Sequence, residues 1–366
     1  MTSVQDGPAG SAAPRSTVDR LEAFLERAGL GGAPLERLVQ DAGERVYYRV
    51  RPASGAVVVC VMARPYEPGT LPFTNSTALY RELGVAAPAI RREVPALGVL
   101  ELQALGDRLL QRAALQGDAT TPALYREALE ILGRIQREGA RIGSAPTASR
   151  SQAFRMALDA PLFAKELRFF VEHFVEGFAG ARPGPAAGAQ LERLLAALAV
   201  EAASGPAVLC HRDYHARNLM APPGPREAGG AGGPRLYVID HQDSRLGPRG
   251  YDLMSLARDP YVATRAAEGG WGLPFDEAEL AGIFCERVGL RESREALTEE
   301  FDTVALQRNL KALGTYGYQA GRRRNPVYRR FVAPTLAFVR ENLDRRHGRR
   351  ERRELFTLLG DLVGFA

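Results

Sequence analysis

The sequence reads HRDYHARN at residues 211–218, between the apolar runs AVLC and LM. Asp240 follows 22 residues beyond Asn218, at the end of a third apolar run, RLYVI. These runs have the length and composition of short strands, and the segment 222–235 between the last two is a turn rich in Gly and Pro. The sequence therefore predicts two strands joined by this turn, which bring the polar loop and Asp240 side by side.

An Asp, an Asn five residues later and a second Asp on the next strand are the groups that phosphoryl transfer requires. Asp213 is the candidate base that orients a hydroxyl group and takes its proton. Asn218 and Asp240 offer an amide oxygen and a carboxylate, which are ligands that suit magnesium. The tripeptide HRD alone occurs often by chance, but the whole loop with Asp240 in place is far rarer. The set therefore predicts a kinase-type site.

The loop resembles the H-R-D-x-x-x-x-N loop of the kinase superfamily. It resembles more closely the H-x-D-x-H-x-x-N loop of aminoglycoside phosphotransferases and choline-kinase-like enzymes, which His215 fits. Protein kinases usually carry a Lys at that position. The resemblance implies ATP as the phosphoryl donor, catalysis by Asp213, and Mg²⁺ held by Asn218 and Asp240. The D-F-G triplet of protein kinases is replaced by DHQ at residues 240–242.

The segment VIDHQDSRLGPRGYDLMSLARDPY, from residue 238, narrows the resemblance. It is similar to the I-D-x-Q-D-x-x-x-G-P-x-x-Y-D-L-x-S-L stretch of bacterial anomeric amino-sugar kinases, which act on N-acetylmuramate and N-acetylglucosamine. Three further segments, at 44–50, 105–108 and 307–314, are more weakly similar to the same kinases. The implied function is ATP-dependent phosphorylation of a hydroxyl group on a small sugar or alcohol. The favoured acceptor is the anomeric hydroxyl of an amino sugar such as N-acetylmuramate or N-acetylglucosamine. The alternatives are a kinase for another alcohol or an aminoglycoside, and a nucleotide-binding pseudokinase.

Four more polar residues near the loop are candidates for supporting roles. His211 is expected to pack and hydrogen bond beneath the loop, with direct catalysis as the alternative. His215 either belongs to the scaffold or lies near the acceptor. By resemblance, Asp252 braces the loop through backbone hydrogen bonds. Asp243 is a candidate for contact with either substrate or magnesium.

The nucleotide contacts are less clearly marked. The strand-like run at 56–65 lacks the Lys that protein kinases place on the α- and β-phosphates. Arg64 is the candidate substitute, and Arg45 with the turn 41–45 is a candidate cover for the phosphates, an ordinary hairpin turn being the alternative. The interlobe linker is expected at Glu101–Gly106, where backbone groups would hydrogen bond to adenine. Neither a P-loop nor Rossmann glycine spacing occurs, which argues against both nucleotide-binding classes.

The chain as a whole is predicted to be an α+β protein with a bilobal, protein-kinase-like fold. A small β-rich N-terminal lobe is expected at 16–103 and a larger, mainly helical C-terminal lobe at 104–366, after a disordered tail at 1–15. In the first lobe we expect a helix at 17–29 with Ser16 as N-cap and Gly29 as stop, strands at 35–40, 46–51, 56–62, 89–94 and 98–102, and a helix at 73–83. In the second we expect helices at 121–138, 151–176 and 186–203.

The composition argues against a membrane protein, a secreted protein and a protein that depends on disulfides. No apolar run is long enough for a membrane span, and the N-terminus lacks the features of a signal peptide, so a cytoplasmic protein is expected. The protein is also expected to be a monomer, with no nucleic-acid or membrane partner. The three cysteines, at positions 60, 210 and 285, form no CxxC pair and are expected as free thiols.

The C-terminal part of the chain is positively charged: residues 302–366 carry 14 Lys and Arg against 6 Asp and Glu. This positive balance suits a neutral or anionic acceptor better than a polycationic aminoglycoside, and no nucleic-acid motif accompanies it.

Overall fold

The computed structural model describes residues 16–38, 45–145, 151–222, 236–266, 273, 275–292, 294–346 and 348–365. The predicted tail at 1–15, most of the turn at 41–45 and most of the Gly/Pro-rich segment at 222–235 lie outside the described residues. The chain divides into two compact units. The first comprises the residues up to 74 together with 88–104, and the second comprises 75–87 together with 105–366.

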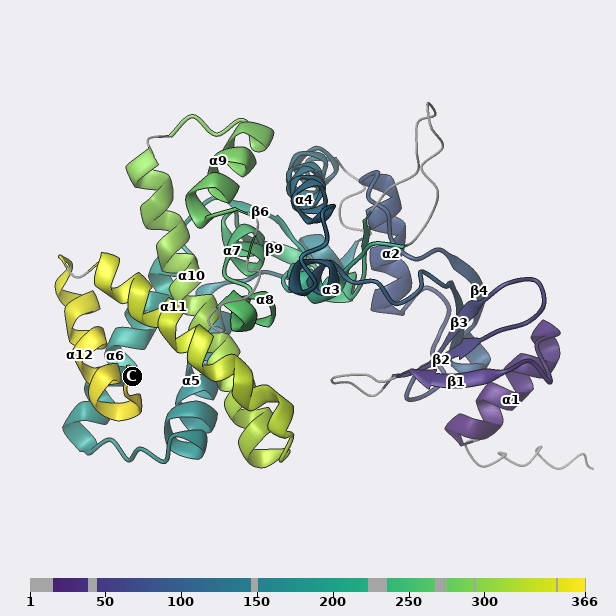
Figure 1. The fold of residues 1–366 in the computed structure, drawn as a ribbon, viewed down its shortest axis with the longest axis horizontal. Coiled ribbons are helices and arrows are strands. Elements are labelled where there is room, and N and C mark those ends of the chain that lie inside the picture. The colour runs from purple at the N-terminus through teal and green to yellow at the C-terminus, as the bar shows by residue number, and fades with distance from the viewer. Residues whose placement is uncertain are drawn as a thin grey trace, which may run out of the picture. The chain divides into compact units, whose positions relative to one another are not determined.

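The first unit is an antiparallel sheet with strand order β1-β2-β3-β5-β4 and one covering helix (Figure 1). The strands are β1 (Leu35–Leu38), β2 (Val46–Val50), β3 (Val57–Val61), β4 (Ile90–Val94) and β5 (Val99–Gln103). Helix α1 (Thr17–Ala28) begins at Ser16, whose side chain accepts a hydrogen bond from the backbone N–H of Asp19 at 3.2 Å. It ends at Gly29, which has a φ of 69°. Both predicted ends of this helix are confirmed.

The central strand β3 is buried on both of its faces. Val59 lies between Tyr48 of β2 and Glu101 of β5, and it packs in a core cluster with Phe24 of α1. On the opposite face, Cys60 packs in a second cluster that includes Phe73. Because both faces of the strand are largely buried, its sequence is a continuous apolar run rather than an alternating one.

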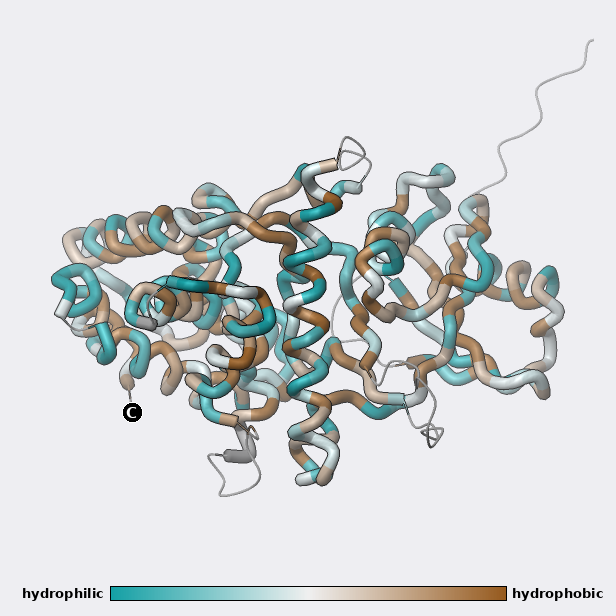
Figure 2. The backbone as a smooth tube through the Cα atoms, turned by 90° about the horizontal axis from the view of Figure 1, so that it is seen from above, coloured by the Kyte–Doolittle hydropathy of each residue, from teal (hydrophilic) through white to brown (hydrophobic). Residues whose placement is uncertain are grey.

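The second unit is mainly helical, and its helices carry hydrophobic and hydrophilic residues in turn along their length (Figure 2). Helix α2 (Pro72–Glu82) lies mostly in this unit. The others are α3 (Leu110–Leu115), α4 (Thr121–Gly143), α5 (Ala160–Phe170), α6 (Pro185–Ala202), α7 (Tyr251–Ala257), α8 (Pro260–Ala266), α9 (Glu277–Val288), α10 (Arg294–Gly317), α11 (Val332–Arg345) and α12 (Arg350–Val363). Two short antiparallel pairs interrupt them, β6 (Ala207–Cys210) with β9 (Arg245–Pro248) and β7 (Leu219–Met220) with β8 (Tyr237–Val238).

The helix predicted at 151–176 is wrong at its start. A short 3-10 helix spans Gln152–Arg155, and the backbone N–H of Leu158 then donates to Leu246 of β9 at 2.7 Å. Helix α5 begins only after Asp159, whose carboxylate accepts from the N–H of Leu162 at 2.9 Å. An N-cap Asp followed by Pro within the first helical turn is a strong start signal, which outweighs helical spacing upstream of it.

Two expectations from composition concern the cysteines and membrane spans. Cys60 and Cys210 are buried, Cys285 is partly buried, and all three are free thiols, as predicted. Among the described residues, no helix combines the length and the apolar character that crossing a membrane requires.

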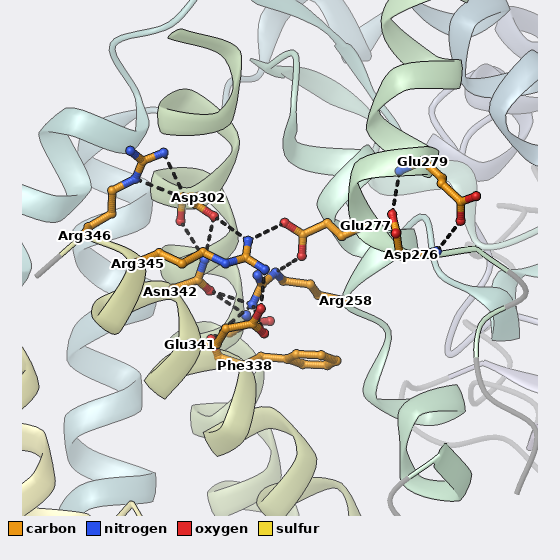
Figure 3. Close-up of polar contacts among 11 residues, drawn as sticks. Arg258, Asp276, Glu277, Glu279, Asp302, Phe338, Glu341, Asn342, Arg345 and Arg346 are labelled. Carbon is orange, nitrogen blue, oxygen red and sulfur yellow. Dashed lines mark hydrogen bonds and ion pairs between the residues drawn. The ribbon is translucent and has the colours of Figure 1, made fainter. Parts of the chain in front are cut away.

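A buried ionic cluster joins helices of the second unit (Figure 3). Arg258, which is 1% exposed, ends α7 and lies 2.7 Å from Glu277 of α9. Its guanidinium also donates to Asn342 of α11 at 3.2 Å. Asp302 of α10 is 2% exposed and lies 3.3 Å from Arg345. Each charge therefore has a partner on another helix, which is the condition for burying it.

We expect Asp302→Ala to lower the free energy of unfolding of the second unit by about 1–3 kcal/mol, because Asn342 and Arg345 lose a buried acceptor. The measurement is urea unfolding followed by far-UV circular dichroism. Asp361→Ala, at an exposed position of α12, is the control. Equal midpoints for the two variants would show that the cluster contributes little to stability.

Candidate active site

The polar loop at 211–218 is held by a sheet at each end. It leaves β6, turns through a short 3-10 helix at Ala216–Asn218 and continues as β7. The backbone N–H of Ile239 donates to the carbonyl of Asn218 at 3.0 Å. This hydrogen bond brings Asp240, the next residue, to the same end of the β7–β8 pair as Asn218.

Two backbone N–H groups just before Asp213 share one buried acceptor. The carboxylate of Asp252, in the first turn of α7, accepts from the N–H of His211 at 2.6 Å and of Arg212 at 2.9 Å. Arg212 has a φ of 84°, a conformation that costs a non-glycine residue about 1–3 kcal/mol. Burial raises the pKa of Asp252, while the hydrogen bonds from the two N–H donors favour its ionised form. The two hydrogen bonds hold the loop in a shape that the Arg212 side chain disfavours.

His211 links the loop to the strand that carries Asp240. Its Nδ1 accepts from the N–H of Asp213 at 3.3 Å, and its Nε2 lies 2.9 Å from the carbonyl of Ile239. A neutral imidazole with its proton on Nε2 satisfies both contacts. Both partners are backbone groups and the ring is fully buried, so these contacts are structural.

Two further buried groups fix the middle of the loop. The hydroxyl of Tyr214 donates to the carbonyl of Ala128 in α4 at 2.7 Å. The carboxylate of Asp259 accepts from the N–H of Ala216 at 2.8 Å. With Asp252, these anchors attach the loop to helices on both sides of it.

Asp213 lies beside a lysine that the sequence reasoning did not assign to the site. Nζ of Lys311, on α10, is 3.0 Å from Oδ1 of Asp213. Burial alone would raise the pKa of Asp213, but the charges of Lys311 and Arg212 outweigh it and hold that pKa well below its usual range. Asp213 is therefore a carboxylate at any physiological pH. Its side chain remains 32% exposed, so it is accessible to a ligand.

Arg212 and Asp243 belong to an ionic group beside the loop. The guanidinium of Arg212 lies 3.1 Å from Glu166 of α5 and 3.7 Å from Asp243. Glu166 also accepts from Gln307 of α10 at 3.0 Å. Asp243, half exposed, lies 3.2 Å from Arg245 as well. The predicted contact of Asp243 with substrate or metal stays a prediction, and its carboxylate pairs with arginines.

The residues predicted to bind magnesium offer suitable atoms. Nδ2 of Asn218 donates to the carbonyl of Asp213 at 2.9 Å, which leaves Oδ1 as the atom available to a cation. Asp240 is exposed, in a left-handed conformation with a φ of 62°, and Oδ1 accepts from Gln242 at 2.8 Å. Among the described residues, no three His, Cys, Asp or Glu side chains converge on a metal site. One amide and one carboxylate fit Mg²⁺, which takes its other ligands from phosphate and water.

Helix α2 supports the segment that follows Asp240. Oγ1 of Thr77 lies 2.9 Å from Nε2 of His241, and the hydroxyl of Tyr80 lies 3.0 Å from Oγ of Ser244. The rings of Tyr80 and His241 are 4.9 Å apart. At the position where protein kinases carry the Phe of D-F-G, this chain has a buried, hydrogen-bonded histidine.

A cavity of about 80 Å³ opens beside Asp213. It is lined by Asp213, His215, Pro260, Tyr261, Arg308, Lys311, Ala312, Thr315 and Tyr316. Burial, together with the positive charge of Arg308, lowers the pKa of His215 to about 3 despite the opposing charge of Asp213, so its imidazole is neutral. Nδ1 of His215 is buried and has no hydrogen-bond partner in the described part of the chain.

The three predicted nucleotide contacts belong to the first unit. Arg45 directly precedes β2, and Arg64 is exposed just beyond β3. Glu101 lies inside β5, paired with strands on both sides, and its carboxylate is 3.6 Å from Arg92. Strand β5 continues to Gln103, so the first part of the predicted linker is strand. The roles of these residues remain predictions.

A family profile and individual relatives both match this chain over most of its length. The profile of the family described as "Phosphotransferase enzyme family" matches residues 34–286. The chain is 28% identical over 335 residues to an N-acetylmuramate/N-acetylglucosamine kinase of Neisseria meningitidis serogroup B, covering 88% of this chain and 89% of the relative. It is 29% identical over 331 residues to a protein of the same name from Pseudomonas putida, covering 88% and 86%.

The fold is shared with solved structures of much lower identity. The structure of a spectinomycin phosphotransferase in complex with ADP and spectinomycin matches with a TM-score of 0.52 at 15% identity, covering 93% of this chain and 98% of that one. The predicted fold class, α+β and protein-kinase-like with a β-rich N-terminal part and a mainly helical C-terminal part, is confirmed.

We expect Lys311→Met to raise the pKa of Asp213, because an adjacent opposite charge favours the carboxylate and its removal favours the neutral acid. The acid limb of kcat/KM against pH should therefore begin at a higher pH in the variant than in the unmodified enzyme. Lys165→Met is the matched control, since Lys165 is the only other lysine and is exposed on α5. Acid limbs that coincide for Lys311→Met and the control would contradict the electrostatic role of Lys311.

Proposed function

The chain belongs to the phosphotransferase enzyme family, and we propose that it transfers the γ-phosphoryl group of ATP to the anomeric hydroxyl of an amino sugar, such as N-acetylmuramate or N-acetylglucosamine. That it is an enzyme acting on a hydroxyl group follows from the family and from its relatives. The donor and the acceptor are the proposal. The observation that carries it is the ionised Asp213, which borders a cavity and shares its loop with Asn218.

Asp213 is suited to orient the acceptor hydroxyl and to take its proton. The carboxylate accepts a hydrogen bond from the hydroxyl, whose oxygen then forms the bond to phosphorus while the bond from phosphorus to the ADP oxygen breaks. Transfer through a loose transition state requires little proton removal before the new bond forms, so a base of low pKa suffices. An anomeric hydroxyl is also more acidic than an ordinary alcohol, because the ring oxygen withdraws electrons.

The magnesium ligands in the proposal are Oδ1 of Asn218 and the carboxylate of Asp240. Mg²⁺ held there supplies neutralisation of phosphate charge during the transfer. Both side chains leave the β7–β8 pair at the end where the loop carries Asp213. The chain thus supplies the base and the cation ligands from one small structural unit.

ATP is proposed because a relative in fold is described with ADP bound. Arg45, Arg64 and the backbone beyond Glu101 are the proposed nucleotide contacts in this chain. Arg64 would take the place of the missing strand-three Lys, with a planar guanidinium in place of an ammonium group.

The acceptor class rests on the names of the relatives and on the charge of the cavity. Two cations, Arg308 and Lys311, line the cavity against one carboxylate, Asp213. This excess of positive charge disfavours the binding of a polycationic aminoglycoside and favours the binding of a neutral or anionic sugar. The pseudokinase alternative is supported by the missing Lys alone, and the complete set of Asp213, Asn218 and Asp240 argues against it.

We expect Asp213→Asn to lower kcat on the order of a hundredfold or more, because the amide cannot accept the proton. The measurement is transfer of labelled phosphate from ATP under saturating conditions. ADP binding and the urea midpoint of the variant serve as controls for folding. Undiminished turnover would remove Asp213 from the role of base.

We expect labelled ATP with magnesium to phosphorylate N-acetylmuramate and N-acetylglucosamine but not choline or kanamycin. The product should release phosphate in dilute acid, because an anomeric phosphate is acid-labile whereas the phosphate ester of an ordinary alcohol is stable. Transfer to kanamycin would favour the aminoglycoside alternative. Absence of transfer to any acceptor, with ADP still bound, would favour the pseudokinase.

A further inference from the structure

Arg308 is a buried arginine with an unsatisfied donor. It lies on α10 and is 5% exposed, and its buried Nε has no hydrogen-bond partner in the described part of the chain. Its positive charge acts on the carboxylates of Asp213, Asp252 and Asp259. Its Cζ lies 5.9 Å from the ring centroid of Tyr251. By contrast, Arg20 donates to the carbonyl of Leu97 at 2.7 Å, and Arg352 lies 2.6 Å from Glu201. A buried guanidinium with an unsatisfied donor is costly, so its retention requires a reason.

Arg308 borders a cavity rather than a filled core. Arg308 lines the same cavity as Asp213 and Lys311. Positions 308, 311 and 315 are three and four residues apart, so these side chains share one face of α10. Lys311 is already paired with Asp213 at 3.0 Å. Arg308 is therefore the cation of the cavity wall that is not held in such a close pair.

We propose that Arg308 binds a carboxylate of the acceptor and thereby makes the enzyme prefer N-acetylmuramate to N-acetylglucosamine. This inference rests on the proposed function. The two sugars differ by one lactyl ether, which gives N-acetylmuramate its carboxylate. Arg308 is a specificity-determining residue in this proposal and not a member of the reacting set.

The position of the cavity favours the acceptor over the transferred phosphate as the source of the anion. The lining residues include Asp213 but neither Asn218 nor Asp240, which are the proposed ligands on the phosphate side. Tyr261 and Tyr316 form aromatic walls, as is usual where the apolar face of a small molecule packs.

The test compares the two sugars across variants of one position. We measure kcat and KM for both sugars with the full chain, with Arg308→Met and with Arg308→Lys, at saturating magnesium and ATP. Arg308→Met should lower kcat/KM for N-acetylmuramate about 10- to 100-fold more than for N-acetylglucosamine, mainly through KM, because a charge-assisted hydrogen bond is lost. Arg308→Lys should restore part of the preference, since it keeps the charge without the planar fork.

Arg322→Met is the matched control, because Arg322 is an exposed arginine in the helical turn that follows α10. Its ratio of the two kcat/KM values should equal that of the unmodified enzyme. Equal losses of kcat for both sugars in Arg308→Met would assign the guanidinium to the phosphoryl group or to the fold, and would overturn the inference. An unmodified enzyme without preference for N-acetylmuramate would overturn it as well, while leaving the proposed function intact.

Calorimetric titration with each sugar, without nucleotide, separates this inference from the proposed function. Tighter binding of N-acetylmuramate that depends on Arg308 supports the inference even if neither sugar is phosphorylated, in which case only the proposed function fails. Absence of binding by either sugar, together with absence of turnover, would overturn both. Urea midpoints of the variants show whether each is folded, and Arg308→Lys gives a second reading if Arg308→Met is not.

Discussion

The hydrogen bonds from the backbone of residues 211 and 212 to the carboxylate of Asp252 are the constraint on which the site depends. They hold Arg212 in the left-handed region, and this reversal of the chain turns the next residue, Asp213, toward α10. The same conformation lets the guanidinium of Arg212 reach Glu166 on α5. One buried acidic side chain thus determines the direction of Asp213 and the place of a neighbouring cation. The backbone strain is offset by two hydrogen bonds that water cannot reach.

The parts of this arrangement that are formed by residues close together in the chain could be predicted from the sequence. The loop at 211–218, its two flanking strands and the ends of α1 all follow from residues adjacent in the chain, and the expected approach of Asn218 and Asp240 needed only a short strand pair. The start of α5 was missed because a strand-like contact with Leu246 competes with helical spacing, and such a contact is not visible in the segment itself.

Lys311 could not be predicted, for a different reason. It lies 98 residues from Asp213, on a helix whose inward face is defined by packing against distant elements, among them α5, α7 and α11. Two signals in the sequence point toward it: the loop at 211–218 lacks the Lys of protein kinases, and the chain has only two lysines in total. Neither signal says which helix brings the ammonium group to Asp213. The same limitation applies to Arg308, one turn earlier on α10, among many arginines of similar local context.

The ion pair between Asp213 and Lys311 also bears on how this chain tolerates recombination. The acid and its cation belong to distant segments, and helices α7, α8 and α9 lie between them in the sequence. A chimera with a breakpoint anywhere between positions 213 and 311 takes the loop from one parent and α10 from the other. If the second parent carries its balancing charge elsewhere, the hybrid has either an unopposed carboxylate or two competing cations at the centre of its site. The loop at 211–218 is therefore not a transplantable module, and a segment that keeps this ion pair intact extends at least from β6 to the end of α10.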